Sequence, residues 1–148
     1  MAPDSEQPPR HSVSVAAAIL DDQGRFLVIR RADNGRWEPP GGVLELDESI
    51  TDGLVREVYE ETGVRVRPGP LTGVYKNMSR GIVALVFRCD AIHGQASSTL
   101  EASEIAWLRP DDVLQRMSPA YSVRLLDALD DRNGPIIRAH DGTVVIGR

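Results

Sequence analysis

The chain has 148 residues, of which 41% are hydrophobic and 26% are charged, and its formal net charge is −5. This length suits one domain with a hydrophobic core and is short for two. The negative charge argues against broad binding to nucleic acids or anionic membranes, because both need a basic surface. A single cysteine excludes an internal disulfide and a zinc site built from cysteines, which fits a reducing cytoplasm. We therefore expect a cytoplasmic protein with no nucleic-acid or membrane partner.

The N-terminal stretch "MAPDSEQPPR" is rich in proline and acidic ahead of its arginine. This composition predicts a disordered tail over residues 1–11 and differs from that of a signal peptide. The longest apolar run, residues 13–20, is far too short to cross a bilayer. A single domain is accordingly expected over residues 12–148.

Two short apolar runs with strand character open this domain, "SVSVAAAIL" (residues 12–20) and "FLVIRR" (residues 26–31). The turn residues "DDQGR" between them predict a hairpin. The next segment, "ADNGRWEPPGGVLEL" (residues 32–46), is dense in glycine and proline. Its two prolines disfavour regular structure and its two adjacent glycines allow a close approach of the backbone, so we expect a loop.

A helix is predicted over residues 48–62, capped by Asp47 or Ser49 and ended by Gly63. Three strand-like runs follow, and the first of them would end at Pro68. These runs are residues 64–69, 71–77 and 81–91. The third run contains Cys89, which we expect to be a buried thiol.

The last third of the chain predicts one strand, two helices and a hairpin. The strand is "EIAWL" at residues 104–108, and the helices cover residues 109–117 and 120–131. The hairpin covers residues 135–147 and turns at Asp141–Gly142. Residues 132–148 would thus form a C-terminal extension, whose exposed edge could pair with a second subunit in a homodimer. The whole order predicts an α+β fold or a three-layer α/β/α sandwich.

Three glutamates, Glu57, Glu60 and Glu61, lie near the end of the predicted central helix. At about 100° per residue they share one face, opposite a packed face that includes Leu54 and Val58. Like charges at these spacings, and acids in the last helical turn, both destabilise a helix. A solvated acidic face is the simplest reading, but a divalent cation would reverse both penalties. Hard oxygen ligands of this kind suit Mg²⁺ or Mn²⁺ and, beside a glycine-rich loop, indicate phosphate chemistry.

The spacing of these residues is similar to the Nudix box, Gly-x5-Glu-x7-Arg-Glu-U-x-Glu-Glu-x-Gly-U, where U is aliphatic. Every fixed position is filled, by Gly42, Glu48, Arg56, Glu57, Glu60, Glu61 and Gly63, with Val58 and Val64 at the aliphatic sites. The flanking "RWEPPGG" and "EASEIAW" also resemble Nudix proteins, so the resemblance covers most of the chain. In size and layout it is similar to MutT-like nucleotide pyrophosphohydrolases. The resemblance implies an α/β/α sandwich with a mixed central sheet and a loop–helix–loop catalytic motif.

The resemblance also implies an activity and a cofactor. Members of the family hydrolyse a nucleoside diphosphate linked to another group, X, by attack of water on phosphorus with Mg²⁺ or Mn²⁺. By their positions in the box, Glu57, Glu60 and Glu61 match metal ligands, and the residue before the box, Gly41, matches a carbonyl ligand. The resemblance thus implies a metal site that includes these four residues. It also implies a small nucleotide as the substrate and partner.

Further roles follow from the same resemblance. Arg56 matches an arginine that orients a neighbouring glutamate, and Glu48 matches a supporting residue. The general base would be Glu57 or a glutamate outside the box. Glu101 and Glu104 are the candidates outside the box, and Glu101 better resembles an additional metal ligand.

Four residues are candidates for substrate contacts. Arg30 and Arg31 end a predicted strand, and because neighbouring strand residues face opposite ways, one of them could reach the phosphates. Trp37 could stack on a base or pack in the core, and Gly42 belongs to the loop that would approach the substrate. Arg36 and Lys76 are further candidates, outside this set.

The size of the chain and its intact box favour a nucleoside triphosphate or a related nucleotide as substrate, because signatures of coenzyme A or NADH hydrolysis are missing. An ADP-ribose or nucleotide-sugar pyrophosphatase is the enzymatic alternative. A Nudix domain that senses a nucleotide without hydrolysing it stays open, although such regulators usually carry a DNA-binding domain. An isopentenyl diphosphate isomerase-like enzyme would need a catalytic cysteine, and Cys89 in its apolar run is a poor candidate.

Overall fold

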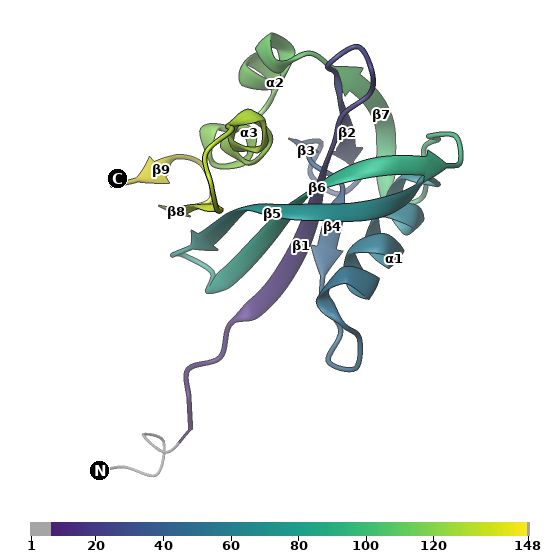
Figure 1. The fold of residues 1–148 in the computed structure, drawn as a ribbon. Helices are drawn as coiled ribbons and strands as arrows, with labels where there is room; N and C mark the ends of the chain where they lie inside the picture. The colour runs from purple at the N-terminus through teal and green to yellow at the C-terminus, as the bar shows by residue number, and fades with distance from the viewer. Residues whose placement is uncertain (1–6, 148) are drawn as a thin grey trace.

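A mixed six-stranded sheet is the centre of the fold in the computed structural model, which describes residues 7–147. Its strands lie in the order β4-β1-β6-β5-β8-β9 (Figure 1). The strands are β4 (Gly41–Val43), β1 (Ser12–Ile19), β6 (Ile82–His93), β5 (Arg65–Asn77), β8 (Ile136–His140) and β9 (Val145–Ile146). The pairs β1–β6 and β5–β8 are parallel, and the other neighbours are antiparallel.

A second sheet has three antiparallel strands in the order β3-β2-β7. They are β3 (Trp37–Glu38), β2 (Phe26–Arg31) and β7 (Ala102–Leu108). The hairpin expected between residues 12–20 and 26–31 is therefore wrong. The turn forms, because the Asp21 carboxylate accepts the backbone N–H groups of Gln23 and Arg25. After one bridge between Leu20 and Phe26, however, the two strands separate into different sheets.

Helices cover both faces of the main sheet (Figure 1). The helix α1 (Ile50–Thr62) packs on one face, and α2 (Pro110–Arg116) and α3 (Pro119–Leu126) pack on the other. Alternation along β1 supplies both cores, since Val15, Ala17 and Ile19 face α1 while Ala16 and Ala18 face the opposite cluster. The predicted α/β/α sandwich with a mixed sheet is thus confirmed.

Two expectations about irregular segments are wrong. The glycine- and proline-rich segment holds two short strands, β3 and β4, on either side of Pro39 and Pro40. The strand β4 lies at the edge of the sheet and pairs only with β1, which a short, glycine-rich strand can do. The runs 64–69 and 71–77 form one strand, β5, and not two. Pro68 lies at a shift in its register, where the missing N–H is tolerated.

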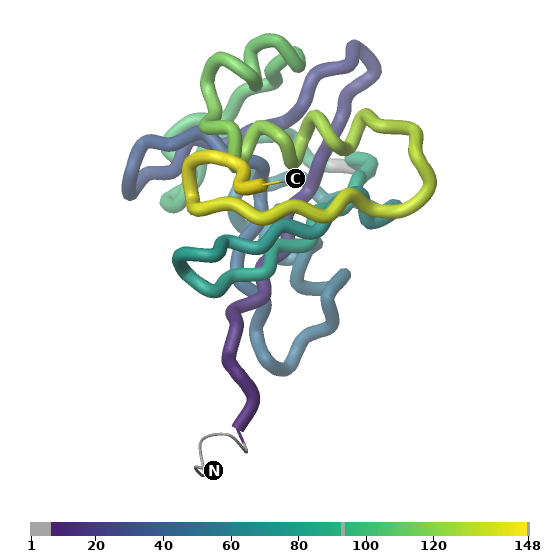
Figure 2. Tube along the Cα trace, turned by 90° about the vertical axis from the view of Figure 1, so that its left-hand side faces the viewer, coloured from purple at the N-terminus to yellow at the C-terminus, as the bar shows by residue number. Residues whose placement is uncertain are grey.

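The C-terminal part differs from the prediction in its helix and in its place in the sheet. The helix α3 ends at Leu126 and continues as a short 3₁₀ turn, η2 (Asp127–Leu129). The strands β8 and β9 form an antiparallel hairpin, but β8 also joins β5 as a parallel neighbour, so this segment is part of the main sheet. Figure 2 shows it running beside the β5–β6 pair.

The N-terminal segment ahead of β1 is exposed where it is described, at residues 7–11, and it leads away from the sheets (Figure 2). Residues 1–6 of the expected tail lie outside the described residues. No helix within residues 7–147 is long and apolar enough to span a bilayer.

Candidate active site

The helix α1 is capped at both ends, by Ser49 and by Gly63. The Ser49 hydroxyl accepts the backbone N–H of Asp52 at 3.1 Å, and Gly63 ends the helix with a left-handed φ of 76°. Gly53 lies in the helix interior, and a Cβ atom there would collide with the side chains of Leu44 and Glu48. The lack of a side chain at this position lets the loop before α1 pack against the helix.

Arg56 forms the central ion-pair network of the site. Its Nε and Nη2 donate to the two carboxylate oxygens of Glu48 at 2.8 and 2.7 Å. Its Nη1 donates to Glu57 at 2.8 Å and to Glu60 at 3.2 Å. The guanidinium holds the pKa of Glu48 near 2, so this carboxylate stays ionised. Arg56 therefore fixes the loop before the helix and orients Glu57 at the same time.

Glu61 is a buried acid, with only 4% of its surface exposed. Its Oε1 accepts the backbone N–H of Gly41 at 2.8 Å, which ties α1 to β4. Burial raises its pKa to about 8, and the charges of Glu57 and Glu101 add to this effect. A carboxylate in such surroundings is stabilised by any cation that reaches it.

Glu57 lies directly against the backbone of Gly42. A Cβ atom at Gly42 would overlap the carboxylate of Glu57, so only glycine allows this approach. Burial raises the pKa of Glu57, while its ion pair with Arg56 opposes that rise. Steric contact with Glu57 thus explains why position 42 of the box is a glycine, which the sequence did not reveal.

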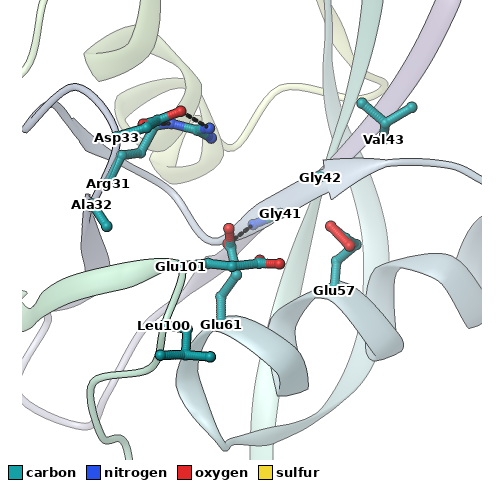
Figure 3. A pocket seen from close by; sticks show the side chains of 10 residues that line it. All are labelled: Arg31, Ala32, Asp33, Gly41, Gly42, Val43, Glu57, Glu61, Leu100 and Glu101. Atoms are coloured by element: carbon teal, nitrogen blue, oxygen red, sulfur yellow. Dashed lines mark hydrogen bonds and ion pairs between the residues drawn. The ribbon is translucent and has the colours of Figure 1, made fainter.

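These acids face a cavity of about 460 Å³ between α1, β4 and the loop before β7 (Figure 3). Figure 3 shows Glu57, Glu61 and Glu101 directed toward the Gly41–Gly42 backbone. Glu60 is different, because its side chain is 46% exposed, pairs with Arg56 and does not line this cavity. The full lining is Arg31, Ala32, Asp33, Gly41, Gly42, Val43, Glu57, Glu61, Leu100 and Glu101.

The donor set suits a hard divalent cation. Carboxylate oxygens and backbone carbonyls are the ligands that Mg²⁺ and Mn²⁺ prefer. Within residues 7–147, however, no three acidic, histidine or cysteine side chains converge tightly enough to form a finished metal centre. The reason lies in the ion pairs, since Arg56 holds Glu57 and Glu60, and the carboxylates repel one another. A cation would have to compete with Arg56 for these oxygens.

The two strand-end arginines face opposite ways. Arg31 lines the cavity, and Asp33 accepts its Nε and Nη2 at 2.9 and 2.8 Å. Arg30 instead donates to Glu104 at 2.8 Å and to the carbonyl of Gly35 at 3.0 Å, away from the cavity. The structure therefore places Arg31 at the candidate site, and Arg30 and Glu104 outside it.

Other candidates also lie away from this cavity. Trp37 packs against the core and its ring lies 5.7 Å below the guanidinium of Arg116. Burial raises the pKa of Cys89 to about 12, so this thiol is not an available nucleophile. Asp33 and Leu100 also line the cavity, and sequence reasoning missed both because neither belongs to the motif.

Comparison with known proteins identifies the family. A model of the NUDIX domain matches residues 10–129. A "MutT-like protein" of Streptomyces ambofaciens is 56% identical over 143 residues, which covers 97% of this chain and 92% of the relative. The chain therefore belongs to the Nudix family, and the prediction of a Nudix pyrophosphohydrolase is confirmed.

More distant relatives carry more specific names. An ADP-ribose pyrophosphatase of Methanocaldococcus jannaschii is 31% identical over 101 residues, covering 64% of this chain and 60% of the relative. A CTP pyrophosphohydrolase of Escherichia coli K12 is 32% identical over 125 residues, covering 78% of this chain and 90% of the relative. The crystal structure of a MutT protein from Methanosarcina mazei Go1 superposes with a TM-score of 0.68 at 31% identity, covering 82% of this chain and 93% of that one.

Proposed function

We propose that this protein hydrolyses a diphosphate linkage in a nucleoside diphosphate-X substrate with Mg²⁺ as cofactor and with Mn²⁺ as a substitute. The observation that carries the proposal is the meeting of Glu57, Glu61 and Glu101 in one cavity beside the Gly41–Gly42 backbone. Three carboxylates in one partly buried site repel one another, and a divalent cation relieves that repulsion.

The residues around the cavity would have two roles, metal binding and positioning of the metal ligands. Glu57, Glu61 and Glu101, with the Gly41 carbonyl, would hold the metal, and Glu60 would join them from the rim once it leaves Arg56. When bound, the metal would neutralise phosphate charge and lower the pKa of a coordinated water. Arg56 and Glu48 would keep Glu57 in place through the ion pairs described above.

A proton acceptor is needed when water attacks phosphorus. The new P–O bond forms as the bridging P–O bond breaks, and the water loses a proton to a carboxylate. Glu57 is our candidate for this base, because its raised pKa favours proton uptake. Glu101 is the alternative, since it lines the same cavity.

Arg31 would contact the substrate phosphates. It lines the cavity, and its guanidinium is half-exposed and held in place by Asp33. Phosphate oxygens are good acceptors for such a planar donor. Arg30, which faces the other way, would have no direct part in binding.

A nucleoside triphosphate or a related nucleotide is the substrate that we favour. The similarity to a CTP pyrophosphohydrolase over most of both chains supports this choice. ADP-ribose is the second candidate, supported by the similarity to an ADP-ribose pyrophosphatase over a shorter stretch.

A panel of nucleotides tests the proposal. Nucleoside triphosphates, ADP-ribose and nucleotide sugars are incubated with the protein in Mg²⁺, in Mn²⁺ and in EDTA, and the products are identified by chromatography. We expect cleavage of a diphosphate linkage only with a metal. If the folded, metal-supplied protein cleaves no member of the panel, the nucleotide-sensing alternative replaces this proposal.

A further inference from the structure

A second cavity of about 370 Å³ adjoins the acidic one. The two share Arg31, Asp33 and residues 41–43. Beyond this shared wall, the second cavity is lined by residues from β1, the β5–β6 turn and α3, which the proposed reaction does not use. They include Ser14, Asn77, Arg80, Tyr121 and Arg124.

Arg124 is the unusual member of this lining. It is a charged residue with only 8% of its surface exposed. Its Nε is fully buried and has no hydrogen-bond partner within residues 7–147. A buried polar group without a partner costs about 1–3 kcal/mol, and more when it is charged.

Arg124 lies next to His140, whose ring cannot accept hydrogen bonds from all the N–H groups that face it. The Nη2 of Arg124 lies 3.2 Å from Nε2 of His140, and the backbone N–H of Gly142 donates to Nδ1 of the same ring at 2.9 Å. A neutral imidazole has one acceptor nitrogen, so it can accept only one of these two donors. In either tautomer a donor is left over in addition to the unpaired Nε.

No carboxylate within the described residues forms an ion pair with Arg124. Asp127 lies in the same region but is occupied, because both its oxygens accept from Arg138 and one also accepts from the Tyr75 hydroxyl. The ring of Tyr121 lies 4.5 Å from the guanidinium, which is favourable but does not replace a counter-ion. Glu38 lines the same cavity, but its carboxylate pairs with Arg31 and lies beyond ion-pair distance of Arg124. Within the described residues, the Arg124 guanidinium therefore has no direct counter-ion.

The second cavity as a whole has the opposite character to the first. Four arginines and two carboxylates line it, and one of those arginines, Arg31, already pairs with both carboxylates, at 2.8 Å with Asp33 and at 3.7 Å with Glu38. The arginines are Arg31, Arg36, Arg80 and Arg124, and the carboxylates are Asp33 and Glu38. The net charge of the chain is −5, so the excess of arginines in this cavity does not reflect the composition of the chain as a whole.

We infer that this second cavity binds a phosphate group that the substrate carries outside the scissile diphosphate, and that Arg124 is its main anchor. The inference rests on the proposed function for the adjoining acidic cavity. It narrows the substrate class to nucleotides with an additional phosphate, such as triphosphates, over nucleotide sugars whose X group is neutral. Arg124 binds this group and takes no part in bond cleavage.

The first test uses inorganic phosphate in EDTA at low ionic strength, so that it needs no metal and no turnover. Isothermal titration compares the wild-type protein with Arg124→Gln and with Arg116→Gln, an arginine that stacks on Trp37 outside this cavity. We expect Arg124→Gln to weaken phosphate binding by about tenfold or more and Arg116→Gln to leave it unchanged. Equal binding by all three proteins, or no binding by the wild type, would overturn the inference.

A measurement on the wild-type protein covers the case in which Arg124→Gln does not fold. The side-chain Nε–H signal of Arg124 is followed by NMR during the same phosphate titration. We expect this signal to shift with the binding curve. If phosphate shifts only signals of the acidic cavity, or none, the inference fails.

The second test separates a substrate phosphate from a free anion. For a nucleoside triphosphate and a nucleotide sugar of the same base, Arg124→Gln should lower kcat/KM for the triphosphate by about tenfold and change that for the sugar less than about twofold. An equal loss for both substrates refutes the inference. Because the phosphate titration needs no hydrolysis, failure of the proposed reaction would be recognised separately.

Discussion

The replacement of Glu61 by glutamine should stabilise the metal-free protein at alkaline pH. Glutamine has the same shape, and its carbonyl oxygen can still accept the N–H of Gly41. What disappears is a buried carboxylate whose pKa is raised from 4.5 to about 8. The variant therefore removes the cost of ionising this group inside the fold.

The size and the sign of the effect follow from the two pKa values. Between pH 4.5 and 8 the folded state holds a proton at Glu61 that the unfolded state has lost. The free energy of unfolding of the wild type consequently falls as the pH rises through this range. At about 1.4 kcal/mol per pKa unit, the full loss at pH 8 is roughly 4 kcal/mol, against about 1 kcal/mol at pH 5. Coupling to the charges of Glu57 and Glu101 makes about 2–4 kcal/mol a fair expectation at pH 8.

Urea unfolding at pH 5 and pH 8 in EDTA measures this difference. Glu61→Gln should exceed the wild type in stability by more at pH 8 than at pH 5. Mg²⁺ should stabilise the wild type at pH 8 and have less effect on Glu61→Gln. Parallel pH profiles for wild type and Glu61→Gln would refute the reasoning.

Two further predictions compare neighbours that the structure places on opposite sides. Arg31→Ala should raise KM by about tenfold through loss of a charged phosphate contact, whereas Arg30→Ala should leave kinetics within about twofold; similar KM values for the two would contradict the assignment. Glu101→Gln should lower kcat by about tenfold or more and weaken activation by Mg²⁺, whereas Glu104→Gln should not. Steady-state kinetics over a Mg²⁺ titration checks this second pair, and an equal response of the two variants would argue against Glu101.

The box and the layers of the fold were predictable because they depend on local spacing. The helical period places Glu57 and Glu61 on one face, and glycine at position 63 ends the helix there. The apolar run at residues 12–20 predicted a strand, and β1 is buried between clusters on both faces of the sheet. Such features need no knowledge of which distant segments meet.

The sequence could not predict which distant segments pair. Pro68 predicted the end of a strand, but the strand continues to Asn77. Pro68 lies at a register shift of β5, outside the stretch Gly73–Asn77 that pairs with β8. The hairpin of β1 and β2 failed because the two strands belong to different sheets. Both errors come from tertiary pairing overriding local turn and proline signals.

The same limit applied to the candidate sites. From the sequence, one of Arg30 and Arg31 could reach the phosphates, and only the pairing of β2 with β7 shows that Arg31 faces the cavity. The surroundings of Arg124 were missed altogether. They combine α3 with His140 of β8, and these meet only because β8 joins the main sheet beside β5.

The turnover of Glu57→Gln tests the central claim most directly. Hydrolysis of the preferred nucleotide is measured with saturating Mg²⁺ for the wild type, for Glu57→Gln and for Glu45→Gln, an exposed glutamate outside both cavities. Circular dichroism confirms that all three are folded. We predict that Glu57→Gln lowers kcat by about a hundredfold or more, as expected for loss of a general base or a metal ligand, while Glu45→Gln stays near the wild type. Full turnover by folded Glu57→Gln would contradict the account.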